Sequence, residues 1–523
     1  MNFDTSDIAE NVPDDPSAAS DPQEEPGLDR GVLIVAGVVV LGAIMSILDI
    51  TVVSVALETF QQEFNATAAE VAWTMTGYTL ALASVIPLTG WAADRFGTKR
   101  LYLLAVLLFT AGSVLCSVAD GLGQLVLFRV IQGLGGGMLM PLGMTILTRA
   151  AGPERVGRVM AVLGIPMLLG PIFGPILGGW LIGIASWHWI FLINLPIGVI
   201  ALAYAAKVLP KDHVEPSESF DWLGMLMLSP GLAAFLYGVS TIPETGTIAD
   251  AEVLVPAIIG LALVGAFVLR SLAGRAEHPL IDLDLFRNRT LSIAVVAMAL
   301  FAIAFFGASL LFPSYFLQVR GETTLQTGWL IAPQGFGAML TMPLAGVLAD
   351  RIGPGKIVMT GIVVITAGMA MFTTVAADTS YVFLLSALFV MGLGMGATMM
   401  PMMTAALQTL TDHNLARGST LMNIVQQVAA SIGTALFSVL LTNGFKSSPE
   451  VGQVQQTLAT GGDPATLDPA VLGKAAVDMA DAFGDSFLVA TILVALCLIP
   501  AAMLPRRRPP VASEPSHEPI IMH

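Results

Sequence analysis

The sequence predicts an all-α polytopic membrane protein with fourteen transmembrane helices. Its 523 residues are 55% apolar and only 12% charged. The mean hydropathy of +0.79 lies outside the range of soluble globular proteins of this size. Fourteen apolar segments follow one another along the chain, each near the length that crosses a bilayer as a helix. A motif of the first half also returns in the second half, which predicts a duplicated helical bundle.

The spans and the two tails follow from segment length and charge. Crossing about 30 Å of hydrocarbon takes roughly 20 helical residues. The predicted spans cover residues 31–57, 70–93, 101–119, 122–148, 157–183, 187–207, 221–241, 253–271, 290–318, 325–349, 357–376, 380–410, 415–442 and 483–504. Residues 1–29 hold nine acidic residues and no Lys or Arg, so we predict a disordered acidic cytoplasmic tail and not a cleaved signal peptide. Residues 506–523 are predicted to form a second cytoplasmic tail.

The distribution of Lys and Arg predicts that both termini are cytoplasmic. With this topology 19 of the 23 basic residues lie in inner loops or flanks, as the positive-inside rule requires. The outer loops are acidic or neutral. The longest, at about 443–481, is rich in Gly, Pro, Asp and Thr and is expected to be partly disordered. We therefore predict a multi-pass protein of the cytoplasmic (inner) membrane.

No motif in the sequence indicates an enzyme, a cofactor or a metal site. The six His residues are scattered, and the sequence has no HExxH, no P-loop and no Ser/His/Asp order. Cys116 and Cys497 both lie inside apolar spans, which argues against a structural disulfide or a zinc site. The acidic net charge of −15 gives no reason to expect a nucleic-acid partner.

An internal repeat divides the chain into two halves. LTGWAADRFGTKR at residues 88–100 is echoed by LAGVLADRIGPGK at residues 344–356, so that Gly90, Ala93, Asp94, Arg95 and Gly97 recur 256 residues later. Two six-helix halves leave two helices over, and the pair at 221–271 has no counterpart. The predicted units are therefore a six-helix bundle over 30–210, two inserted helices with a connector over 211–285, and a second six-helix bundle over 286–505.

Five motifs, in order along the chain, resemble those of the major facilitator superfamily. GWAADRFGTKR is similar to its loop between helices 2 and 3, and RVIQG at 129–133 to its helix-4 motif. GPIFGPILGG, within 164–181, resembles the helix-5 antiporter motif of exporters. LDITVVSVAL at 48–57 and HPLIDLDLFRNR at 278–289 resemble the helix-1 motif and the connector of the fourteen-helix drug-proton antiporters of the EmrB/QacA type. The resemblance covers about residues 30–505 and implies the major facilitator fold.

One position departs from this family pattern. The helix-1 motif usually ends in Ala-Leu-Pro, whereas Glu58 follows Leu57 here. Glu58 is either an exposed surface residue or an acid that draws cations to an outer vestibule.

Asp49 and Arg129 are the candidate proton-coupling residues. Both lie well inside apolar spans, where a charged side chain is costly and usually faces a cavity or a partner. Asp49 is about 13 Å from Glu58 along its helix and Arg129 about 11 Å from Leu122, so their depths nearly match. The resemblance implies that helices 1 and 4 both line the central cavity. Two interpretations stay open: a titrating carboxylate that couples protons to substrate, or a static ion pair between two helices.

The repeated loops are predicted to gate one end of the bundle. Charge-assisted bonds between neighbouring helices can hold one conformation there and break in another, and glycines permit the tight turn. The alternative is a loop that only anchors the membrane interface. The candidate gating residues are Gly90, Asp94, Arg95, Gly97, Lys99, Arg100, Asp350 and Arg351.

The fifth span carries glycines four residues apart, at Gly170, Gly174 and Gly178. This spacing places them near one face of a helix, where another backbone can approach closely. Pro171 and Pro175 each remove a main-chain hydrogen bond, so the helix is expected to bend. The resemblance assigns these residues and Gly179 to the antiporter motif. The alternative is an ordinary packing helix.

The substrate surface is predicted from both halves. Met395 and Met399 suit a promiscuous apolar site because methionine is flexible and polarisable, although such residues are more often core or lipid-facing. Asn423 and Gln427 bring amides into the thirteenth span. From the first half, Asp49 and Gln132 complete the set of candidate substrate-binding residues.

Together these features predict a proton-coupled multidrug efflux transporter that works by alternating access and exports hydrophobic or cationic amphiphilic compounds. Export of an endogenous lipid-like metabolite and a proton-coupled nutrient symporter stay open, as does a membrane-embedded scaffold or receptor. The expected partners are small hydrophobic or cationic substrates, protons and membrane lipids, and an accessory envelope protein is left open.

Overall fold

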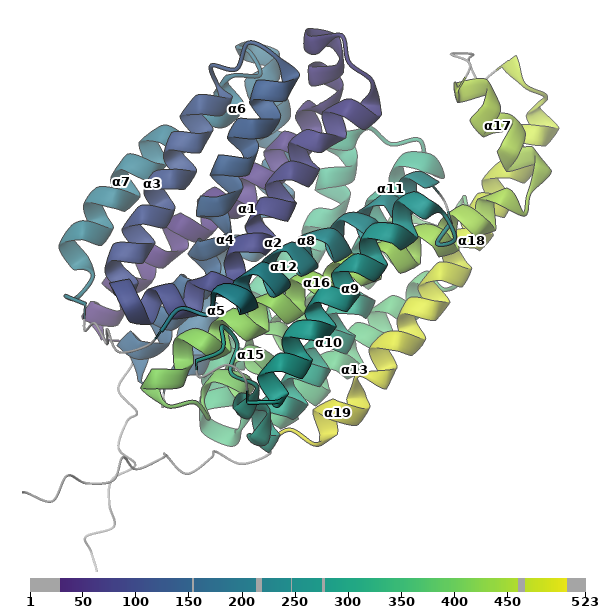
Figure 1. The fold of residues 1–523 in the computed structure, drawn as a ribbon. Coiled ribbons are helices and arrows are strands. Elements are labelled where there is room, and N and C mark those ends of the chain that lie inside the picture. Colours follow the sequence, from purple (N-terminus) through teal and green to yellow (C-terminus); the bar gives the residue numbers. More distant parts are fainter. Residues whose placement is uncertain are drawn as a thin grey trace, which may run out of the picture.

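The fold is described by a computed structural model that covers residues 29–152, 155–212, 219–245, 247–274, 278–459 and 466–505 (Figure 1). The predicted tails lie outside these residues, apart from Asp29. Every regular element in the described ranges is a helix, which confirms the predicted all-α class.

Thirteen helical segments of the described chain are long and apolar enough to cross a membrane. They match thirteen of the fourteen predicted spans. The remaining span, 157–183, is α5, a continuous helix of 29 residues whose side chains are described only in part. The chain is therefore an integral multi-pass membrane protein, and a count of fourteen spans is consistent with its structure.

Seven helices form the first bundle, drawn in purple and blue in Figure 1. Their bounds are α1 Arg30–Phe64, α2 Ala68–Phe96, α3 Thr98–Cys116, α4 Leu122–Ala151, α5 Val156–Ile184, α6 Trp189–Leu192 and α7 Asn194–Val208. α1 extends beyond its predicted end at residue 57. Glu58 is an exposed residue within it, and the helix ends only where Asn65 adopts a left-handed conformation.

Nine helices form the second bundle and its extensions. Their bounds are α10 Arg289–Ser309, α11 Leu311–Gln318, α12 Thr324–Ile352, α13 Pro354–Phe372, α14 Tyr381–Gly396, α15 Met399–Leu407, α16 Asp412–Lys446, α18 Pro469–Leu496 and α19 Leu498–Ala502. The duplication is structural: α2 packs on α4 as α12 packs on α14, and α1 on α5 as α10 on α16. Even the capping boxes correspond, with Thr67 and Glu70 starting α2 and Thr323 and Gln326 starting α12.

Proline explains why four predicted spans are each split into two helices. The breaks fall at Ile193, at Leu310, at Ala397 with Thr398, and at Cys497. In each case a proline follows a few residues later, namely Pro196, Pro313, Pro401 and Pro500. Because proline has no N–H, it leaves the carbonyl four residues earlier without its helical donor. That carbonyl lies at the break or directly before it.

The inserted pair comprises α8 (Trp222–Thr245) and α9 (Ala251–Leu272), followed by the short 3-10 helix η1 (Leu283–Arg287). α8 packs on α9 and also contacts both α2 and α16, so it bridges the two bundles along one side. An ion pair between Asp221 and Arg270, with 2.7 Å between Oδ1 and Nη1, joins the two helices at one end.

The long segment at 443–481, predicted as a partly disordered loop, contains helical structure in its described part. Pro449–Ala459 forms helix α17, and α18 starts at Pro469, well before its predicted start at residue 483. Asp468 caps α18 through the N–H of Ala470, and Ser448 donates a 2.6 Å hydrogen bond to Asp478. Polar contacts of this kind hold the segment, which its composition does not reveal. Residues 460–465 lie outside the described part.

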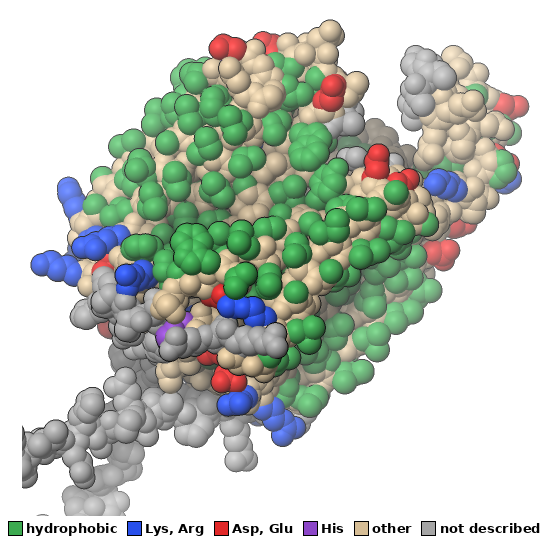
Figure 2. Space-filling view, viewed as in Figure 1, with side chains coloured by type: hydrophobic (Ala, Val, Ile, Leu, Met, Phe, Trp, Pro, Cys, Tyr) green, Lys and Arg blue, Asp and Glu red, His purple; other side chains and the backbone are tan. Residues whose placement is uncertain are grey.

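Charge separates the two ends of the bundle. Figure 2 shows a broad belt of hydrophobic side chains, with most of the visible Lys and Arg at its lower left and acidic side chains along its upper margin. We call the end that carries Arg95, Lys99, Arg100 and Lys211 the basic end. The end that carries Glu58, Glu63 and Glu70 is the opposite end.

The glycines of α4 allow its tight packing against α2 and α3. A Cβ at Gly135 would lie 2.5 Å from the backbone nitrogen of Phe109, which is closer than real Cβ atoms come. We predict that Gly135→Ala lowers the free energy of unfolding by about 1–3 kcal/mol, because the backbone of α3 must shift. Thermal unfolding of the purified protein in detergent measures this.

The matched control is Gly123→Ala in the same helix, where a Cβ would meet no described atom within 4 Å. Equal melting temperatures for the two variants would show that the contact of α3 with α4 is not tight.

Candidate functional site

Asp49 of α1 and Arg129 of α4 meet in the interior of the first bundle. Both side chains are fully buried, and Nη1 of Arg129 donates directly to Oδ2 of Asp49. Gln132, one turn along α4, accepts from the same Nη1 at 2.8 Å and donates to Oδ1 of Asp49 at 2.7 Å. The structure therefore brings together three of the predicted site residues.

Arg129 is held by α2 as well. Its Nε donates to the carbonyl of Thr74 at 3.0 Å, and its guanidinium lies over the ring of Tyr78, 4.2 Å from the centroid. Its Nη2 has no hydrogen-bond partner among the described residues. The ring face of Tyr78 provides a favourable cation–π contact for this buried charge.

The proline-induced break between α6 and α7 brings a second side-chain amide to the site. Asn194, the first residue of α7, donates to Oδ1 of Asp49 at 3.3 Å and to Oγ of Ser113 at 3.0 Å. Ser113 of α3 in turn donates to the carbonyl of Phe191 at 2.9 Å. The interrupted helix thus supplies both a side chain and a backbone acceptor to the network.

The hydrogen-bond pattern describes the ionised form of Asp49. Its two oxygens accept from Arg129, Gln132 and Asn194, and a carboxylate is an acceptor-only group. Protonation would turn one oxygen into a donor and remove the counter-charge of a fully buried guanidinium. Losing one member of a buried ion pair costs about 3–5 kcal/mol. The arrangement can therefore respond strongly to one proton.

The antiporter-motif glycines of α5 pack directly against α1 beside Asp49. A Cβ at Gly170 would collide with Ile47, one at Gly174 with Thr51, and one at Gly178 would lie 3.1 Å from the carbonyl of Val52. Thr51 also donates to the carbonyl of Gly170 at 3.1 Å. A Cβ at Gly179 would meet no described atom within 4 Å. The side chains of Pro171 and Pro175 lie outside the described ones.

Asp94 and Asp350 both connect the two bundles at the basic end. Asp94, near the end of α2, lies 3.6 Å from Nε of Arg417 on α16, and both side chains are largely shielded from solvent. Asp350, near the end of α12, accepts from the backbone N–H of Gly157 at 2.8 Å and of Arg158 at 3.2 Å. It thus caps the start of α5. A carboxylate is favourable there because the first N–H groups of a helix have no acceptor within the helix. The two halves are joined at this end.

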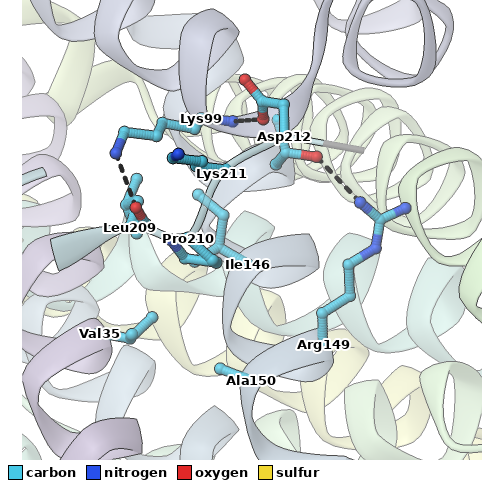
Figure 3. Close-up of a pocket in the computed structure, with 10 residues that line it drawn as sticks. Val35, Lys99, Ile146, Arg149, Ala150, Leu209, Pro210, Lys211 and Asp212 are labelled. Carbon is cyan, nitrogen blue, oxygen red and sulfur yellow. Dashed lines mark hydrogen bonds between the residues drawn. The ribbon is translucent and has the colours of Figure 1, made fainter. Parts of the chain in front are cut away.

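The remaining candidate gating residues of the two repeated loops lie at the same end. Gly97 has φ +94 and its repeat partner Gly353 φ +90, a conformation that favours glycine. The backbone N–H of Lys99 donates to Asp212, and its Nζ donates to the carbonyl of Leu209 at 2.7 Å (Figure 3). The backbone N–H of Arg100 also donates to Asp212, at 3.2 Å. Arg95 and Arg351 lie in the last turns of α2 and α12, and Gly90 faces Thr420 of α16.

The predicted substrate residues are not gathered at one place. Gln132 belongs to the charge network. Met399 of α15 is buried in the core, and Met395 of α14 and Gln427 of α16 are half-buried. Asn423 of α16 lies between the bundles, where its amide nitrogen is 3.1 Å from the sulfur of Met144 on α4. Their role in binding stays a prediction.

Sequence reasoning missed several partners of the charged residues. Asn194, Thr74 and Tyr78 contact the Asp49–Arg129 pair, while Arg417 and Arg158 face the gating carboxylates. Asn194 had a usable signal, because an amide two residues before a proline inside an apolar span marks both a polar group and a helix break. No feature of the sequence indicates that the backbone carbonyl of Thr74 accepts a hydrogen bond from Arg129.

Two related helical bundles in a membrane, with a buried charge pair in one and charged loops joining both at one end, define the class of secondary transporters. The comparisons with known proteins identify the family. A model of the Major Facilitator Superfamily matches residues 39–434, so the chain belongs to that superfamily.

Relatives with drug-export names align over most of the chain. The "Multidrug resistance protein B homolog" of Mycobacterium tuberculosis is 53% identical over 494 residues, covering 92% of this chain and 91% of that protein. The "Multidrug export protein EmrB" of Haemophilus influenzae is 31% identical over 422 residues, covering 80% of this chain and 82% of that protein. These relatives bear out the resemblance to EmrB-type exporters.

Solved structures share the fold. The human organic anion transporter MFSD10 aligns with a TM-score of 0.57 at 14% identity, covering 88% of this chain and 99% of that one. The proton:xylose symporter XylE aligns with a TM-score of 0.56 at 13% identity, covering 89% of this chain and 96% of that one. The chain therefore has the major facilitator fold.

Removing the charge of Asp350 should weaken closure of the basic end. We predict that Asp350→Asn shifts the equilibrium toward separation of α5 and α12 by about 1.5–3 kcal/mol, the usual contribution of a hydrogen bond to a charged group. Spin labels are attached to Arg100→Cys and Thr360→Cys, which are exposed positions near this end in the two halves. Double electron–electron resonance then measures the distance between the two labels. Both native cysteines are buried.

Asp284→Asn serves as the control, since this exposed carboxylate pairs only locally with Arg287 three residues along the chain. An Asp350→Asn distance distribution identical to that of the control would argue against a gating role.

Proposed function

We propose that this protein exports hydrophobic or cationic amphiphilic compounds across the cytoplasmic membrane in exchange for protons. The observation that carries the proposal is the buried Asp49–Arg129 pair at the centre of a major facilitator bundle. The drug-export names of relatives that cover most of the chain support the substrate class. With the basic end facing the cytoplasm, both termini are cytoplasmic, as the positive-inside rule favours.

The proposed cycle couples one buried charge to the gate. With the basic end closed and Asp49 ionised, a proton from outside neutralises the carboxylate and displaces the substrate. Arg129 then loses its counter-charge, and the contact between α1 and α4 weakens. α1 moves together with α5, whose first turn is held by Asp350, so the basic end can open and release the proton inside. A new substrate binds as Asp49 becomes ionised again.

The division into bundles over 30–210 and 286–505, with the inserted pair over 211–285, belongs to the same proposal. The two bundles rock against each other while the inserted helices follow. Membrane lipids surround the apolar belt, and an accessory envelope protein stays a prediction.

Export of an endogenous lipid-like metabolite and nutrient import would use the same charge pair. Collapse of the proton gradient in cells loaded with a fluorescent amphiphile separates import from export, because only an exporter then retains more dye.

We predict that Asp49→Asn abolishes efflux driven by a pH gradient and leaves the protein in the membrane. The amide keeps the shape of the side chain and removes the group that takes up the proton. Dye flux into inverted vesicles, acid inside, measures the loss. Glu58→Gln, an exposed acid on the same helix, is the control and should transport normally. If the Asp49→Asn variant is inserted in the membrane and still transports dye at the wild-type rate under a pH gradient, Asp49 is not the proton-coupling residue.

The tight contact between α5 and α1 leads to a second prediction. Gly174→Val should lower the rate of proton-coupled dye flux at least tenfold, either by stalling transport or by uncoupling it from protons. The reason is that the valine side chain would occupy the space of Thr51. Gly179→Val, in the same helix without a described neighbour at its Cβ, should leave the rate near that of the wild type. Proton leak and dye flux in the same vesicles distinguish uncoupling from stalling. Normal coupled flux in Gly174→Val would show that the motif serves only in ordinary helix packing.

A further inference from the structure

We propose that a membrane-facing groove between α2, α4 and the inserted helix α8 is a docking site for hydrophobic compounds that carry a hydrogen-bonding group. The site would collect such compounds from the inner leaflet before they reach the central path. This inference rests on the proposed function and assigns a task to the inserted helices.

The groove has a volume of about 280 Å³ and an almost wholly hydrocarbon lining. Val85 and Leu88 come from α2, Leu134 from α4, and Met225 and Leu226 from α8. Its size is close to the lower limit of small-molecule pockets, so it suits one flat ring system or the apolar part of a larger compound.

Two backbone and side-chain features make the groove more than a lipid contact. Ser229 lines it and is 7% exposed, and its Oγ is enclosed without a hydrogen-bond partner among the described residues, so a χ1 rotation is what would turn the hydroxyl into the groove. Other serines of these helices donate to their own helix, for example Ser84 to Leu80 at 2.7 Å and Ser240 to Tyr237 at 2.9 Å. Pro230 follows directly, and because it has no N–H, the carbonyl of Leu226 loses its helical donor.

These unsatisfied groups select the occupant. An unpaired polar group in hydrocarbon costs free energy, and an acyl chain cannot remove that cost. A hydrophobic compound with an amine or hydroxyl can donate to the carbonyl of Leu226 and, once the Ser229 side chain rotates toward it, exchange a hydrogen bond with that hydroxyl. We therefore assign the groove to such compounds and not to lipid tails.

A cluster of aromatic rings lies beyond the groove toward the basic end. Trp91 is three residues from Leu88 on α2, and its ring centroid is 4.3 Å from that of Phe220, which lies 4.5 Å from Trp222. The ring of Trp222 is largely exposed. Rings at this depth bind flat or cationic groups through stacking and cation–π contacts. The site thus offers an apolar slot with a polar pair and an aromatic rim.

The position of the groove connects it to the gate. α8 is fixed against α2 by the stacked rings of Tyr237 and Trp73, 5.6 Å apart, on the side of the opposite end. Toward the basic end, α2 carries Asp94, which contacts Arg417 of α16. A compound in the groove therefore lies against the helix that holds one of the two carboxylate contacts described between the bundles at the basic end.

Ethidium is a suitable probe because it is a flat hydrophobic cation with two aromatic amines, and tetraphenylphosphonium is a hydrophobic cation without donors. Ser229→Ala should raise the KM for ethidium relative to that for tetraphenylphosphonium by about 2- to 10-fold, the effect of one hydrogen bond. Ser240→Ala, in the same helix, should leave the ratio at the wild-type value. An unchanged ratio in Ser229→Ala would overturn the polar part of the proposal.

A second experiment does not depend on turnover. Ethidium monoazide is photolysed with the full-length protein in lipid nanodiscs, and labelled peptides are mapped by mass spectrometry. The proposal expects labels on α2 and α8 at the groove that are reduced at least fivefold by Leu134→Trp, which fills it. Leu127→Trp, two turns away on the same face of α4, should not reduce them.

Labels confined to other helices, no labels at all, or labels at the groove that Leu134→Trp leaves unchanged would each overturn the proposal. If the wild-type protein is labelled at the groove but fails to extrude either cation under a proton gradient, the proposed function fails and the docking site stands.

Discussion

A charged carboxylate and a charged guanidinium can remain inside this bundle only while each offsets the other. Asp49 and Arg129 are both fully buried, and Gln132, Asn194 and Thr74 complete most of their hydrogen bonds. Neither charge alone would be tolerated there, since an unpaired buried ion is strongly destabilising. The packing of α1, α2, α4 and α7 is therefore arranged around one electrostatic contact that a proton can break.

Glycine packing links that contact to the rest of the protein. Gly170 and Gly174 leave α5 so close to α1 that the two helices cannot separate locally without losing the bond from Thr51. The first turn of the same α5 is held by Asp350 of the other bundle, and the two backbones meet there at Gly157 and Gly346. One helix thus touches both the charge site and the gate. This continuity is the reason to expect that the small residues of α5 matter for coupling as well as for stability.

Periodicity and composition predicted the spans well because each apolar segment must cover the bilayer regardless of its neighbours. The repeat at Asp94 and Asp350 predicted two equivalent loops, and both indeed join the bundles. Their partners, Arg417 and Arg158, could not be predicted, because they lie on helices that approach only in the folded protein. The breaks before Pro196 and Pro313 were within reach of the sequence, since a missing N–H acts locally. The helix α17 was not, because polar contacts such as that of Ser448 with Asp478 hold its segment.

Infrared difference spectroscopy of the purified protein tests the central claim most directly. If substrate and proton compete through Asp49, acidification should produce the band of a protonated buried carboxylic acid, and addition of ethidium at the same pH should diminish this band and release protons to the medium. Both changes should be lost in Asp49→Asn. A band that is insensitive to ethidium, or one that is unchanged in Asp49→Asn, would contradict the account, because the charge pair would then be a static link between α1 and α4.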